Sequence, residues 1–144
     1  MNKQTLRLAL ILMAVFTLSA VSANAQQGIR VNVPFDFTVG DTTLAAGSIT
    51  AHPVSAADAG PLTIRNYDKG QQAFRIARRA QGADSSEQAK LVFHRYGDRY
   101  FLAEVWISGY NAWTVVKSKS EKTLIREMRI SKNVKQEVVS IFAD

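Results

Sequence analysis

The side chains in this sequence that are best suited to binding a ligand or to reacting gather around one expected hairpin tip. They are basic or aromatic, and they are His94, Arg95, Tyr96, Arg99 and Tyr100. Guanidinium groups and aromatic faces together can hold an anionic or sugar-like ligand. A structural interpretation is also available, because a two-residue loop places Arg95 opposite Tyr100 and Tyr96 opposite Arg99. We favour the structural interpretation, since the register predicts those contacts directly, and keep the ligand site as the alternative.

Three aromatic residues further along the chain offer a second candidate, an exposed platform for a sugar ring. They are Trp106, Tyr110 and Trp113. Trp106 falls within the apolar pattern of the hairpin and is expected in the core. Tyr110 and Trp113 therefore join the candidate ligand-binding residues.

Catalytic and metal-binding patterns are weak. His52 and His94 are the two histidines, and neither has further ligands at the spacing that a metal site needs. No G-x-S-x-G turn and no glycine-rich phosphate loop occurs. We therefore expect no metal, no cofactor and no catalytic residue. The alternative is a small hydrolase or isomerase that uses His94 as its acid–base.

A hairpin from Lys90 to Ile107 must position the candidate residues. Gly97, in the first central position of its tip, suits a type II′ turn. Alternation assigns one face to Val92, Phe101, Ala103, Val105 and Ile107. It assigns the other face to Leu91, Phe93, Leu102 and Trp106. Because both faces are partly apolar, we expect this hairpin at the centre of a sheet that is covered on both sides.

The rest of the chain after residue 25 also favours strands. Apolar and polar residues alternate from Ile29 to Val39, and Pro34 predicts an edge position or a break within that stretch. In the segment Ala73 to Arg79, Phe74 and Ile76 share one face. Glu137 to Phe142 is a last strand candidate.

One helix is expected near the C-terminus. Ser118 followed by Glu121 forms a capping box, in which each side chain accepts from a free backbone N–H of the other residue. Leu124, Ile125 and Met128 give a narrow apolar stripe, and the helix should end between Ile130 and Asn133. The sequence thus predicts a mainly β fold, a single-domain antiparallel β-sandwich or flattened barrel with one short C-terminal helix, over residues 26–144.

Residues 1–25 have the layout of a signal peptide. Lys3 and Arg7 precede an apolar run from Leu8 to Val21, and small residues at Ala23 and Ala25 suit a signal peptidase. The run is shorter than the roughly 20 apolar residues of a spanning helix. We therefore expect cleavage after Ala25 and an exported protein, periplasmic or extracellular, that does not span the membrane after cleavage.

The charge of the chain limits the classes of partner that it could bind after export, and its cysteine content decides whether disulfides can form. The net charge of +6 falls to +4 when Lys3 and Arg7 leave with the signal. After export the available polyanions are envelope lipids, anionic glycans and wall polymers, so we expect an anionic or glycan envelope component and no nucleic acid. The chain has no cysteine, which excludes disulfides. The sequence does not indicate an oligomeric state.

Two further segments carry a family resemblance. Val33 to Gly40 reads V-P-F-D-F-T-V-G, and Leu44 to Ala51 reads L-A-A-G-S-I-T-A. They resemble the V-P-F-D-F-x-V-G and L-P-A-G-x-Y-x-V segments of a family of short exported bacterial proteins without an assigned activity. Ala45 and Ile49 depart from that family's proline and tyrosine. The resemblance implies a shared β fold and no activity, so the expected function is binding or a structural role at the bacterial cell envelope.

The processing site gives a direct test. Mass spectrometry of the exported protein should find Gln26, or its pyroglutamate form, as the first residue. An intact Met1 in the membrane fraction would contradict export and release.

Overall fold

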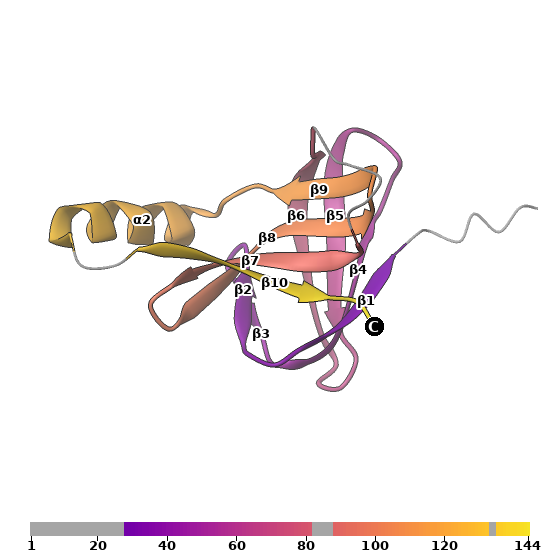
Figure 1. Cartoon of the computed structure of the whole chain (residues 1–144), viewed down its shortest axis with the longest axis horizontal. Coiled ribbons are helices and arrows are strands. Elements are labelled where there is room, and N and C mark those ends of the chain that lie inside the picture. Colours follow the sequence, from indigo (N-terminus) through magenta and orange to yellow (C-terminus); the bar gives the residue numbers. More distant parts are fainter. Residues whose placement is uncertain (1–27, 82–87, 133–134) are drawn as a thin grey trace, which may run out of the picture.

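A computed structural model describes residues 28–81, 88–132 and 135–144 (Figure 1). The expected signal segment lies outside these residues. Within them the chain forms strands β1 Ile29–Val33, β2 Phe37–Val39, β3 Thr42–Leu44, β4 Gly47–Pro53, β5 Ala59–Asn66, β6 Gln71–Arg79, β7 Lys90–Tyr96, β8 Arg99–Ser108, β9 Asn111–Val115 and β10 Gln136–Phe142, with helix α2 at Lys119–Ser131. No described helix is long and apolar enough to cross a bilayer.

The strands form one open, mixed sheet. Its main path runs β1-β4-β5-β6-β9-β8-β2-β3, and β7 lies between β8 and β10. Every pairing is antiparallel except that of β2 with β8, where Thr38 lies opposite Phe101. The sheet curls until β1 contacts β10 and β7. The expected mainly β fold with one helix near the C-terminus is confirmed, and its shape is consistent with a sandwich or flattened barrel.

The N-terminal alternation builds one wall of the core. Ile29, Val31 and Val33 on β1 are buried, and so are Phe37 and Val39 on β2. The residues between them are exposed or half-buried, as a period of two requires. The predicted break is confirmed, because β1 ends directly before Pro34 and β2 begins only at Phe37.

The central hairpin has the predicted register at its tip. Phe93 lies opposite Leu102 and His94 opposite Phe101. Gly97 has a φ of +65°. No other residue of the tip has a positive φ, the pattern that a type II′ turn needs.

One part of the face assignment is wrong, because the register shifts by one residue between Val92 and Phe93. Beyond this bulge each position of β8 turns to the opposite face. Val105 is therefore in the core, opposite Leu91. Trp106 lies on the outer face, where its indole N–H donates to Glu104 Oε2 at 2.7 Å.

Helix α2 begins and ends as the sequence predicts. Ser118 Oγ accepts from the Glu121 N–H at 3.1 Å, and the helix ends at Ser131. The helix extends away from the sheet, with the start of β10 running back beside it (Figure 1). The segment that leads into it is fixed by Arg75 on β6, which donates to the carbonyls of Val116 and Lys117 at 2.9 and 3.0 Å.

Two glycines with the same backbone conformation test this packing. Gly97 and Gly40 have φ values of +65° and +64°. Alanine at Gly97 would meet open space, so Gly97→Ala should lower the free energy of unfolding by about 1 kcal/mol for the left-handed conformation alone. Alanine at Gly40 would also meet Arg75 Cδ at 3.0 Å, so Gly40→Ala should cost more. Urea denaturation measures both, and an equal or smaller loss at Gly40 would contradict the packing.

Candidate ligand-binding site

A buried carboxylate ties α2 to the sheet. Glu121, in the first turn of the helix, is only 4% exposed. Its Oε1 accepts from the Tyr96 hydroxyl at 3.0 Å and lies 3.6 Å from His94 Nδ1. The capping box assigned this carboxylate to the Ser118 N–H, but the structure turns it toward β7. A buried carboxylate needs such partners, because leaving it without hydrogen bonds would cost several kcal/mol.

Tyr96 is the donor in this contact. Burial raises the pKa of its hydroxyl, and the negative charge of Glu121 and the hydrogen bond to it raise the pKa further. Tyr96 therefore stays protonated and can keep donating. The hydroxyl is also 3.3 Å from Gln136 Oε1, but it has a single proton, which the shorter bond to a carboxylate takes. The Gln136 amide is left to hydrogen-bond elsewhere.

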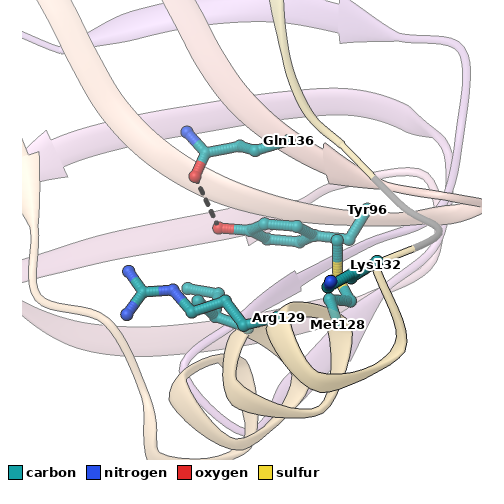
Figure 2. Close-up of a pocket in the computed structure, with 6 residues that line it drawn as sticks. Tyr96, Met128, Arg129, Lys132 and Gln136 are labelled. Atoms are coloured by element: carbon teal, nitrogen blue, oxygen red, sulfur yellow. Dashed lines mark hydrogen bonds between the residues drawn. The ribbon is translucent and has the colours of Figure 1, made fainter.

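A pocket of about 320 Å³ opens between α2 and the strands β7 and β10. Its lining comprises Tyr96, Ile125, Met128, Arg129, Lys132 and Gln136. Figure 2 shows the polar ends of Tyr96, Gln136 and Arg129 on the same side of this space. A volume of this size lies at the small end of the range for small-molecule sites. The arrangement combines apolar side chains, two cations and an amide, which is suited to an anion with an apolar part.

Lys132 occupies an unusual backbone position at the edge of the pocket. It caps the C-terminus of α2 in the left-handed conformation, with φ of +54°, and its N–H donates to the Met128 carbonyl. Glycine or asparagine is the common choice there. A non-glycine residue in the left-handed conformation indicates a role for its side chain. The side chain of Lys132 adds positive charge to the pocket.

A second, smaller cavity lies behind the buried carboxylate. Its volume is about 50 Å³, and its polar lining residues are His94, Glu104, Thr114, Lys117 and Glu121. His94 Nδ1 is buried there without a hydrogen-bond partner among the described residues. The cavity has room for water but not for an organic substrate. Across the described residues, no group of three or more acidic, histidine or cysteine side chains is placed to hold a metal ion.

The hairpin-tip candidates do not form one site. Tyr96 lines the larger pocket and His94 the smaller cavity. Arg95 pairs with Glu137 at 3.3 Å and lies 5.5 Å from the centre of the Tyr100 ring. The contact with Tyr100 is the cross-strand contact of the structural interpretation, and the pair with Glu137 on β10 was not foreseen.

The remaining two tip residues also make contacts within the hairpin or beside it. Tyr100 stacks on Phe35, with ring centres 3.8 Å apart. Arg99 lies over the Phe101 ring at 5.2 Å, so it contacts a different ring from the Tyr96 ring opposite it. The tip therefore presents no single cluster of free guanidinium and aromatic groups.

The proposed aromatic platform needs a correction. Trp113 is only 1% exposed and packs in the core, whereas Trp106, expected in the core, is half-buried on the outer face. Of the three platform residues, only Tyr110 is largely exposed, at 71%. The bulge in the central hairpin turns Val105 into the core in place of Trp106, and Trp113 on β9 lies opposite Val105 and so shares its face.

Four residues of the site were missed by sequence reasoning. They are Glu121, Arg129, Lys132 and Gln136. The capping box accounted for Glu121, and cations near the end of a helix are ordinarily explained by the helix dipole. The usable signal was a lysine at the position just after the helix, where a glycine is usual.

Removing the Tyr96 hydroxyl tests the buried contact. Tyr96→Phe should lower the free energy of unfolding at neutral pH by roughly 1.5–3 kcal/mol, because the hydrogen bond to a carboxylate is lost. The wild-type advantage is fully present below the unfolded pKa of tyrosine, about 10, and falls as pH rises further, because the unfolded chain loses this proton first. Denaturation between neutral and alkaline pH measures the difference between the two proteins.

The matched control is Tyr67→Phe, since Tyr67 is 54% exposed and its ring contacts to Arg30 and Arg65 survive the change. A gap between wild type and Tyr96→Phe that stays constant into alkaline solution would contradict the buried position of the hydroxyl.

Comparisons of the chain with protein-family models, with curated proteins and with solved structures gave no match. The resemblance to short exported bacterial proteins therefore stays a prediction. The candidate site depends on the geometry of its residues alone.

Proposed function

We propose that this protein is an exported domain that binds a small organic anion with an apolar part, as a non-catalytic component of the bacterial cell envelope. The observation that carries the proposal is the pocket beneath α2, where Arg129 and Lys132 stand beside the apolar side chains of Ile125 and Met128. Tyr96 and Gln136 complete the lining with groups that can orient a polar head.

The charge balance of the pocket supports an anion. Among the residues that the structure describes, its lining contains two cations and no acidic residue. The buried carboxylate of Glu121 accepts a hydrogen bond from Tyr96 and does not line this pocket. An anionic head that contacts either cation would form charge-assisted hydrogen bonds, which are about twice as strong as neutral ones. The apolar remainder would cover Ile125 and Met128, whose side chains are only half-buried.

The location belongs to the same proposal and is supported by the signal-peptide layout of residues 1–25. Anions with an apolar part are plentiful at an envelope, as free fatty acids and as fragments of lipids or modified glycans. Their shared chemistry is a carboxylate or phosphate beside a hydrocarbon group. The pocket volume of about 320 Å³ favours the smaller members of that class.

The enzyme alternative receives partial support from the closeness of His94 and Glu121, although the 3.6 Å between His94 Nδ1 and Glu121 Oε1 is longer than a hydrogen bond. Its weakness is space, because the cavity beside His94 is about 50 Å³. A hydrolase or isomerase must admit the reacting atoms next to its acid–base. Binding in the larger pocket is the function that the geometry supports better.

Binding of a fluorescent apolar anion, anilinonaphthalene sulfonate, tests the pocket, with octanoate as the competitor. The double variant Arg129→Ala/Lys132→Ala should weaken binding by about tenfold or more, because the charge-assisted contact is lost whichever cation supplies it. Octanoate should displace the dye from the wild type. Fluorescence titration gives both dissociation constants.

The matched control is Lys119→Ala/Arg126→Ala, which removes one lysine and one arginine from the same helix at exposed positions outside the pocket. The control should bind as the wild type does. Equal weakening in both double variants would mean that general charge, and not the pocket, attracts the anion. A loss confined to Arg95→Ala/Arg99→Ala would return the site to the hairpin tip.

A further inference from the structure

The outer face of strands β4, β5 and β6 exposes large apolar side chains that lie next to one another. Phe74 and Ile76 on β6 are 62% and 51% exposed, and Val54, just after β4, is 45% exposed. Ile76 lies opposite Pro61, and the Val54 N–H donates to the Pro61 carbonyl at 2.9 Å. The register therefore places all three side chains on one continuous surface, which we call the β6 face.

Strand β6 buries its small residues and exposes its large apolar residues, the reverse of the usual arrangement. Ala73 and Ala77 point into the core, while the larger Phe74 and Ile76 point outward. The sequence predicted that Phe74 and Ile76 share a face, and the structure shows that this face is the outer one. Folding stability gains little from a large apolar residue left in water. Contiguous exposed apolar residues with polar borders are typical of interaction sites.

Arginines frame the β6 face. Arg30 and Arg65 lie over the Tyr67 ring at 5.5 and 4.7 Å, and both flank Thr50 in the outward-facing row of β1, β4 and β5. Arg78 lies on the other side of the apolar residues, in the outward-facing positions of β6 opposite Ala59. This border of positive charge is complementary to an anionic partner.

Two acidic groups that the structure describes near this face are engaged by other partners. Asp58 pairs with Arg79 at 3.2 Å, and Asp68 accepts from the Ser48 N–H at 2.7 Å. A second copy of this face would bring arginine against arginine, which opposes self-association. An extended peptide could not add to β4 or β5, because each is paired with a strand on both sides, and β6 is paired with β9 over Ala77–Arg79.

We propose that the β6 face is a contact surface for an anionic phospholipid bilayer. Phe74, Ile76 and Val54 enter the interface between headgroups and acyl chains, and Arg30, Arg65 and Arg78 contact lipid phosphates. Apolar burial and attraction to anionic lipids both add to the strength of such peripheral contacts. The β6 face and the pocket beneath α2 lie on different strands, so a negative result for one proposal leaves the other unaffected.

Co-sedimentation with vesicles tests this surface, with the protein purified as its host produces it. Vesicles of phosphatidylglycerol and phosphatidylcholine should bind the wild type, and vesicles of phosphatidylcholine alone should bind it several-fold less. Phe74→Ser/Ile76→Ser should weaken binding to the anionic vesicles by about tenfold, because two half-exposed apolar side chains no longer enter the interface. Arg30→Gln/Arg65→Gln/Arg78→Gln should abolish the preference for anionic vesicles.

The chain offers a closely matched control on β10. Val138 and Phe142 are 64% and 50% exposed, so Val138→Ser/Phe142→Ser removes one branched and one aromatic side chain whose combined exposure is similar to that of Phe74 and Ile76. This control should bind vesicles as the wild type does, and circular dichroism should show all variants folded.

Three results would overturn the proposal. One is a wild type that does not bind anionic vesicles, and another is equal weakening by the β6 and β10 variants. The third is a concentration-dependent dimer in sedimentation that Phe74→Ser/Ile76→Ser abolishes without changing vesicle binding, which would assign the face to a second copy of this chain.

Discussion

The buried carboxylate of Glu121 is the constraint on which the candidate site depends. A carboxylate removed from water needs hydrogen-bond donors, and the Tyr96 hydroxyl on β7 supplies one at 3.0 Å. The Ser118 cap fixes the turn that carries Glu121, and Arg75 fixes the segment before it. Helix α2 therefore starts at a defined place against the sheet.

Polar anchoring at one end explains why a pocket can exist under the rest of the helix. Leu124, Ile125 and Met128 form the apolar stripe, yet each is only half-buried. Had this stripe packed fully against β7 and β10, apolar burial would have closed the space. The helix instead leaves about 320 Å³ beside Tyr96, with the cations of its last turns at the edge. The same contact thus orders the helix and opens the pocket.

Local patterns in the sequence were sufficient to predict most strands and the helix. They were not sufficient to predict the candidate site, because the site depends on contacts between residues far apart in the sequence. The Ser118 cap and the break at Pro34 follow from backbone chemistry within a few residues, so both are confirmed. The outward position of Trp106 depends on a bulge, which period-two reasoning does not foresee, and the burial of Trp113 follows from its position opposite Val105. The partner of Glu121 lies 25 positions away on another element, and no local pattern indicates it.

The Glu121 contact holds α2 in place over the pocket. Amide hydrogen exchange measures this hold when wild type is compared with Glu121→Ala. We expect exchange of the α2 amides from Leu124 to Met128 to accelerate by about tenfold or more in the variant, since the anchor contributes over 1.4 kcal/mol to local stability. The amides of β9 should keep their protection. Unchanged exchange in α2, or an equal increase in α2 and β9, would mean that Glu121 does not anchor the helix.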